Sequence, residues 1–267
     1  MQNASLTEIG GRGVFTKELE IALLERRIDL AVHSLKDLPT ILPEDLQLSA
    51  VFKREDVRDA LVLPVDSNTS TASIKILREN ASIGTSSLRR ASQIKALRPD
   101  LILRDVRGNV DTRLKKIDAG EYDAILLAVA GLKRLNFEKR ISAYLSIDEM
   151  LPQVGQGALG IETRIEDAET NSLVAALNDV ETQLAVTAER AFLRGLGGGC
   201  QFPIAAYAVI EKEMLRLRGL VATPDGSRIL RDEIVGEKEF SVQLGAQLAH
   251  SLLEQGAQDL INLNSDA

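Results

Sequence analysis

The sequence predicts an α/β protein with two lobes joined by crossovers and a small C-terminal α+β domain. Apolar runs alternate with amphipathic segments between residues 81 and 129, which is typical of parallel βαβ units. A further apolar run at 158–162 follows a glycine-rich link, and we expect it to return to the first lobe. Apolar segments at 204–210, 215–221 and 227–234 indicate an antiparallel sheet, and an amphipathic helix follows them.

The chain of 267 residues is long enough for two domains or three small ones. We expect the first lobe to comprise residues 1–53 with about 158–176, the second lobe 60–152 and the C-terminal domain 180–267. Apolar residues make up 45% of the chain and charged residues 27%, as in ordinary globular proteins. The chain has no apolar run of membrane length, no signal pattern and no paired cysteines. We therefore predict a cytoplasmic protein.

The first lobe begins with a predicted helix from about Phe15 to Arg27, and a short strand follows at 29–33. Lys36 and Asp37 come soon after this strand, at the edge where open α/β sheets bind their ligands. No strand precedes the helix. We therefore expect a truncated first lobe, with unpaired backbone groups and exposed apolar surface.

Three interpretations are open for Lys36 and Asp37. A surface ion pair would contribute little, and a Schiff-base lysine would need an apolar environment that this stretch does not show. A carboxylate inside a basic pocket, in contrast, can stabilise a cationic intermediate and exchange protons. Nearby His33 is more often a satisfied structural histidine, and His250 a surface one, so neither is assigned a role.

A basic segment dominates the second lobe. Between residues 84 and 116 there are nine basic residues against three acids, although the whole chain has a net charge of −7. A positive pocket inside an acidic protein suits a small polyanion and argues against nucleic-acid binding. The hydroxyls at 85–87 are expected to cap the helix that follows them. Together with the free amides there and the arginines at this turn and the next strand–helix turn, they predict an anion site. Its candidate residues are Thr85, Ser87, Arg89, Arg90, Arg107 and Arg113. The alternative is a solvated basic helix face.

The chain has a single cysteine, Cys200, after three glycines that leave the backbone free to move. A helix predicted from about Glu181 to Arg194 precedes this loop, with Gly195 as its stop. A lone cysteine can be core filler, a nucleophile, a metal ligand or an attachment point. The cysteine and histidines show no metal-ligand spacing, so no metal is expected.

The motifs, taken together, closely resemble those of the porphobilinogen deaminase family. They cover nearly the whole chain, and several are long and specific. In chain order they include GGRGVFTKELE, AVHSLKDLP, REDVRDALV, IGTSSLRRASQ, RGNVDTRL, YDAILLAVAGLKRL, LPQVGQGALGIE, TAERAFL and GGGCQFPIAAYA.

The resemblance implies a three-domain transferase, expected to be a monomer, that joins four porphobilinogen molecules head to tail and releases ammonia at each step. It implies a dipyrromethane cofactor attached covalently to Cys200 and a catalytic carboxylate at Asp37. Ammonia loss would leave an azafulvene cation that Asp37 stabilises. The residues implied to bind cofactor or substrate are Arg12, Lys36, Thr85, Ser87, Arg89, Arg90, Arg107, Arg113 and Gln156. No membrane or nucleic-acid partner is implied.

Two departures from the family pattern stand out. Members normally begin several dozen residues earlier, with a strand, a helix and cofactor-contacting residues that have no counterpart here, so impaired folding or cofactor loading is expected. Arg12 stands where the family often has lysine. The main alternative is a small-anion binding protein, because two periplasmic-binding-protein-like lobes also form receptors. A cysteine hydrolase is a weaker alternative, because no histidine is evidently placed to activate Cys200.

Overall fold

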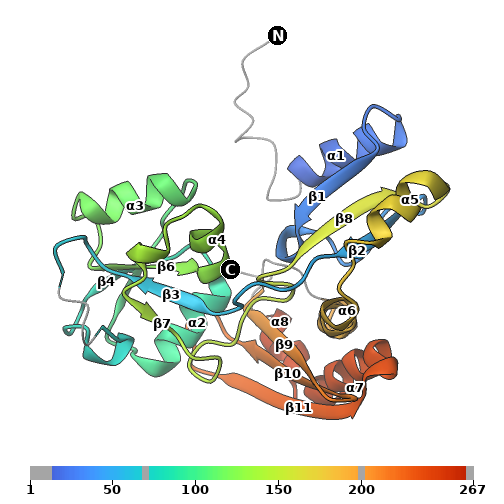
Figure 1. Cartoon of the computed structure of the whole chain (residues 1–267). Coiled ribbons are helices and arrows are strands. Elements are labelled where there is room, and N and C mark those ends of the chain that lie inside the picture. Colours follow the sequence, from blue (N-terminus) through green and yellow to red (C-terminus); the bar gives the residue numbers. More distant parts are fainter. Residues whose placement is uncertain (1–13, 68–71, 198–201, 263–267) are drawn as a thin grey trace, which may run out of the picture.

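The computed structural model describes residues 14–67, 72–197 and 202–262. The first lobe contains α1 (Val14–Leu24), β1 (Leu30–Ser34), the 3-10 turn η1 (Leu35–Asp37), β2 (Leu46–Val51), β8 (Leu159–Arg164) and α5 (Ala168–Ala175). The strands pair in the order β1-β8-β2, with β8 antiparallel to both neighbours (Figure 1). Apolar contacts place α1 and α5 on opposite faces of this sheet. The predicted return of the chain to the first lobe is thus confirmed.

The second lobe contains β3 (Asp59–Val62), η2 (Ile74–Ile76), β4 (Ser82–Gly84), α2 (Leu88–Leu97), β5 (Ile102–Arg104), α3 (Val110–Asp118), β6 (Ala124–Ala128), α4 (Val129–Arg134), η3 (Glu138–Arg140) and β7 (Ala143–Tyr144). Its sheet has the order β5-β4-β6-β3-β7 (Figure 1). Strand β4 is parallel to β5 and β6, which confirms the predicted βαβ units. Strand β3 adds to this sheet in the antiparallel direction, so the sheet is mixed.

Helices cover both faces of the second-lobe sheet. Leu61 and Leu126 pack on one face with Ile94 of α2, whereas their strand neighbours pack on the other face with Leu114 of α3 and Leu132 of α4. Burial on both faces explains why β6 reads as an unbroken apolar run, since neither set of alternating side chains meets water.

The C-terminal unit contains α6 (Val180–Gly195), β9 (Ile204–Glu211), β10 (Met214–Ala222), β11 (Ile229–Glu237), η4 (Lys238–Phe240), α7 (Ser241–Glu254) and α8 (Ala257–Asn262). The strands form an antiparallel meander in the order β11-β10-β9, as predicted. Phe192, Leu217, Leu248 and Leu260 join the helices to one face of this sheet in a single core. The boundaries of the three domains remain the prediction made from the sequence.

Helix α6 ends at Gly195, as predicted, but Gly195 is not the left-handed residue that stops it. Leu196 is the C-cap, and the residue in the left-handed region is Gly197, with φ +63°. A Cβ on Gly195 would lie only 2.7 Å from the Cβ of Ala249 in α7. Gly195 is therefore needed for close helix packing, and Gly197 supplies the left-handed turn.

Two segments join the lobes: an outgoing crossover, residues 52–58, and a returning crossover, residues 145–158. A buried ion pair connects both crossovers to the C-terminal unit. Arg54, on the outgoing crossover, donates from Nη1 to Oε1 of Glu189 in α6 over 2.6 Å. Glu189 also accepts the backbone N–H of Gly155, on the returning crossover, and that of Ala208 in β9. The fully buried carboxylate of Glu189 thus holds the two crossovers and the C-terminal unit together.

Candidate functional site

A polar cavity of about 210 Å³ lies between the two lobes. Residues from the first lobe, from two helices of the second lobe and from the returning crossover meet there. The lining residues among those the structure describes are Lys36, Asp37, Ser86, Ser87, Arg90, Arg113 and Gln153. The lining includes three cations and one carboxylate, so it carries a net positive charge and suits an anionic ligand.

The strand end of β1 positions Lys36 and Asp37. Leu35 is buried, and its backbone N–H donates to the carbonyl of Ala158 on the returning crossover. Gly155 has φ +71°, and a Cβ there would lie 3.1 Å from the backbone of Leu35. This close approach fixes the η1 turn, so that the two residues after Leu35 face the cavity as predicted from the strand-end rule.

The environment of Lys36 differs from the sequence-based interpretation. Burial of the ammonium group, followed by the nearby charge of Arg90, lowers the pKa of Lys36 below its ordinary value. The flanking sequence gave no sign of this, because the groups that surround Lys36 come from other parts of the chain. Asp37, in contrast, is exposed to solvent at the cavity.

The hydroxyl groups of Thr85 and Ser86, which precede α2, bind backbone groups of nearby loops and do not cap the helix. Ser87 occupies the N-cap position, but its side chain makes no capping hydrogen bond to any described residue, so that prediction is wrong. Oγ1 of Thr85 accepts the N–H of Ser87, and Oγ of Ser86 bonds both backbone groups of Val106. Ser86 and Ser87 line the cavity, whereas Thr85 is buried and, among the described residues, is not part of the lining.

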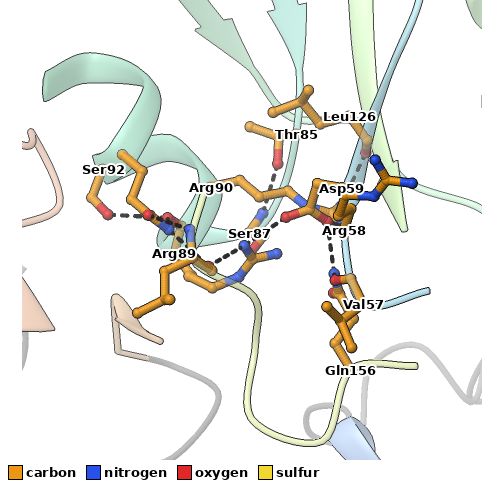
Figure 2. A network of polar contacts seen from close by, with 12 residues as sticks. Val57, Arg58, Asp59, Thr85, Ser87, Arg89, Arg90, Ser92, Leu126 and Gln156 are labelled. Carbon is orange, nitrogen blue, oxygen red and sulfur yellow. Dashed lines mark hydrogen bonds and ion pairs between the residues drawn. The ribbon is translucent and has the colours of Figure 1, made fainter. Parts of the chain in front are cut away.

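Arg89 and Arg90 are both buried and both bind Asp59, a residue that sequence reasoning missed (Figure 2). Nη1 of Arg89 donates to Oδ2 of Asp59 over 2.7 Å and to the carbonyl of Leu151. Nε and Nη2 of Arg90 donate to Oδ1 of Asp59 over 3.1 and 2.6 Å. Burial alone would raise the pKa of Asp59, but the two arginines outweigh it and hold that pKa well below its usual range.

Only one arginine of this pair borders the cavity. Arg90 is a lining residue, whereas Arg89 is turned toward Asp59 and Leu151 and is absent from the described lining. Adjacent helical residues leave the helix about 100° apart, so one arginine can border the cavity while its neighbour does not. Gln156 is also fully buried, and its Nε2 donates to Asp59 and to the carbonyl of Val57. Gln156 therefore supports Asp59 and lies outside the described lining.

The two arginines at the second strand–helix turn also separate. Nε of Arg113 donates to the carbonyl of Gly108, and Arg113 lines the cavity. The side chain of Arg107 is 87% exposed, lies 4.0 Å from Asp105 and is absent from the described lining. The predicted residues Arg12 and Cys200 lie outside the described part of the chain.

Two further predictions concern histidines and metals. His33 is buried with its Nε2 2.9 Å from Oε2 of Glu162, as expected for a structural histidine, and His250 is an exposed residue beside Glu254. Within residues 14–67, 72–197 and 202–262, no cluster of His, Cys, Asp and Glu side chains could hold a metal ion. No helix in these ranges is long and apolar enough to span a membrane.

Sequence reasoning missed Asp59, Ser86 and Gln153. A partial signal for Asp59 was available, because an acid inside an otherwise apolar segment is expected to be buried beside a cationic partner. Asp59 is the acid at the start of the apolar segment that becomes β3.

Comparison with solved structures found distant similarity to bacterial and reconstructed proteins. The BvgS VFT2 domain of Bordetella pertussis is 16% identical, with a TM-score of 0.37, over 66% of this chain and 72% of that one. A putative periplasmic sulfonate-binding protein of Methylobacillus flagellatus is 15% identical, with a TM-score of 0.35, over 68% and 53%. The ancestral amino acid-binding protein AncCDT-1 is 15% identical, with a TM-score of 0.33, over 59% and 65%.

Comparison with family models gave matches along most of the chain. Residues 1–172 match the porphobilinogen deaminase, dipyromethane cofactor binding domain. Residues 183–254 match the porphobilinogen deaminase, C-terminal domain. The family acts in tetrapyrrole synthesis with a dipyrromethane cofactor, and its substrate is porphobilinogen. The two matches account for the motifs of both lobes and of the C-terminal unit, and the chain therefore belongs to the porphobilinogen deaminase family.

Proposed function

We propose that this chain is a hydroxymethylbilane synthase, which condenses four porphobilinogen molecules head to tail and releases one ammonia for each. The product would be hydroxymethylbilane for haem and related tetrapyrroles. The observation that carries the proposal is the cavity between the lobes, which Lys36, Arg90 and Arg113 line together with Asp37. We also propose that the protein acts as a cytoplasmic monomer and binds neither nucleic acid nor a membrane.

The charges of the cavity match the substrate. Porphobilinogen carries an acetate and a propionate arm, and arginine forks and a lysine ammonium are suited to carboxylates. Ser87 adds a hydroxyl group that can donate a further hydrogen bond. Because each added unit brings two more carboxylates, a net positive lining is required throughout the synthesis.

The residues around the cavity also fit the family's dipyrromethane cofactor. Arg90 and Arg113 line the cavity, and their guanidinium groups can pair with the carboxylate arms of two linked pyrroles. When bound, the cofactor supplies the pyrrole end on which the chain is built. We propose that Cys200 holds it through a thioether and that Arg12 contributes a further cation.

Asp37 is proposed to act on the reacting substrate. The C–N bond of the aminomethyl group breaks, ammonia leaves, and the methylene carbon becomes a cation whose charge is shared with the pyrrole nitrogen. A carboxylate beside that N–H stabilises the cation electrostatically. A new C–C bond then forms to the free carbon of another pyrrole, whose displaced proton Asp37 can accept and pass on. Water captures the final cation to give the hydroxymethyl group.

The test is turnover of porphobilinogen by the purified chain, measured as ammonia released and as hydroxymethylbilane trapped by cyclisation to a porphyrin. The proposal expects about one ammonia per porphobilinogen consumed and a large loss of rate in Asp37→Asn. If the chain bound porphobilinogen but released no ammonia, a small-anion binding protein would be the better description.

A further inference from the structure

Asp59 collects hydrogen bonds from two arginines and a glutamine, although it lies outside the described lining of the cavity (Figure 2). Its carboxylate is fully buried. Besides the arginine contacts, Oδ1 accepts Nε2 of Gln156 over 3.0 Å. A single carboxylate thus joins the first strand of the second lobe, helix α2 and the returning crossover.

We propose that Asp59 is a positioning residue that sets the guanidinium group of Arg90 for carboxylate binding in the cavity. The inference rests on the proposed function and deepens it, because it names the group that determines where a substrate carboxylate is bound. Asp59 itself touches no substrate.

The hydrogen-bond geometry of Arg90 supports this role. A guanidinium group has five N–H donors in a fixed plane. Among the described residues, Arg90 donates its Nε–H and one N–H of Nη2 to Asp59, and it donates one N–H of Nη1 to the carbonyl of Leu126. One N–H remains on each terminal nitrogen, which is the number that a carboxylate takes in a bidentate pair.

The supports of Arg90 are rigid. Asp59 begins β3 and Leu126 lies within β6, and these strands pair with each other through four residues each. Contacts on two paired strands fix the plane of the guanidinium group more tightly than a flexible loop could. Arg90 is only 7% exposed, so it has little room for another rotamer.

Charge balance supports the same role. Asp59 neutralises one of the two guanidinium groups, so the cluster keeps a net positive charge next to the cavity. Without Asp59, two buried cations would repel each other and lose their shared acceptor. Arg90 would then turn toward other acceptors, and the cavity would lose a preorganised donor pair.

The experiment compares Asp59→Asn with Asp123→Asn. Asp123 is a matched control because it also accepts an arginine, Arg78, and the N–H of Ser82, yet it precedes β6 at the opposite end of the sheet. Both variants keep the size of the side chain and remove its charge. For each, KM and kcat for porphobilinogen are measured beside the thermal midpoint.

We expect Asp59→Asn to raise KM by about 10- to 100-fold, the effect of a lost charge-assisted hydrogen bond, with a much smaller change in kcat. Asp123→Asn should alter the thermal midpoint but leave KM within about twofold, since its effect on binding is indirect. Equal KM values in the two variants would mean that Asp59 is only structural and would overturn the proposal.

A spectroscopic measurement separates this proposal from the proposed function. In ¹H–¹⁵N side-chain spectra, the Nε–H signal of Arg90 is assigned by its loss in Arg90→Lys. We expect a distinct, slowly exchanging signal in the unmutated protein and its loss or averaging in folded Asp59→Asn. An unchanged signal would overturn the positioning role, even if the chain proved unable to release ammonia from porphobilinogen.

Where Asp59→Asn does not fold, Asp59→Glu provides the same test. This variant keeps the negative charge that the buried arginines need and displaces the carboxylate by one methylene. The proposal expects a raised KM and a shifted Arg90 signal in this variant. A KM and an Arg90 signal equal to those of the unmutated protein would contradict it.

Discussion

Gly245 in α7 offers a test of how tightly the C-terminal helices are packed. A Cβ at this position would lie 2.3 Å from the carbonyl oxygen of Ala188, 2.7 Å from the Cβ of Ala191 and 2.8 Å from the backbone nitrogen of Phe192. Two of these atoms belong to the backbone of α6 and cannot rotate away. The change Gly245→Ala therefore forces the two helices apart.

The size of the effect follows from two opposing contributions. Alanine is favoured over glycine inside a helix by about 1 kcal/mol, which would stabilise the variant. The carbonyl contact is about 1 Å shorter than ordinary van der Waals contact, and overpacking of this kind costs about 3 kcal/mol when backbone must move. The net loss is about 2 kcal/mol, or about 4–8 °C in thermal midpoint for a chain of this size.

The assay is thermal and urea unfolding followed by far-UV circular dichroism, with Gly131→Ala as control. Apart from the backbone of α4 itself and the chain neighbours of Gly131, no described atom lies within 4 Å of a Cβ built on this glycine. Propensity alone should therefore act and stabilise this variant by up to about 1 kcal/mol. The two substitutions, chemically identical, should thus have opposite signs. If Gly245→Ala were as stable as the unmutated protein, the close approach of α6 and α7 would be refuted.

Two further predictions concern the cavity. Burial lowers the pKa of Lys36, so its cation is present below that pKa and is lost above it. KM for porphobilinogen should therefore rise with pH below the range in which an ordinary lysine titrates, and initial rates across pH should show this rise displaced upward in Lys36→Arg. A rise at the same pH in both proteins would assign it to another group. Asp37→Asn should lower kcat by about 100-fold or more with little change in KM, because a carboxylate that acts on developing charge affects the transition state. Steady-state kinetics would check this, on a variant whose circular dichroism spectrum is unchanged. A change confined to KM would make Asp37 a binding residue.

The sequence allowed the fold class to be predicted because its periodic signals are local. The apolar run of β6 and the glycine-rich link before β8 each identified their elements, and the strand-end rule placed Lys36 and Asp37 at the cavity. The helix end at Gly195 was predicted, but the role of this glycine was misjudged, because glycine serves both left-handed turns and close packing. Only the position of Ala249, far along the chain, distinguishes them.

The orientation of arginines could not be predicted in the same way. Arg89 and Arg90 look equivalent in sequence, yet their directions depend on Asp59, about 30 residues earlier, and on how α2 is rotated against β3 and β6. Arg107 and Arg113 differ similarly, since only Arg113 folds back on its own loop and reaches the cavity. Side-chain direction depends on tertiary contacts, and a single sequence does not display them.

The most direct test of the central claim is the intact mass of the purified chain under denaturing conditions, beside Cys200→Ser prepared in the same way and also incubated with porphobilinogen. We predict that the unmutated chain is heavier than its sequence by two linked pyrrole units and that Cys200→Ser is not. If, after incubation, both proteins had the mass calculated from their sequences, this chain would not build the cofactor that its proposed function requires.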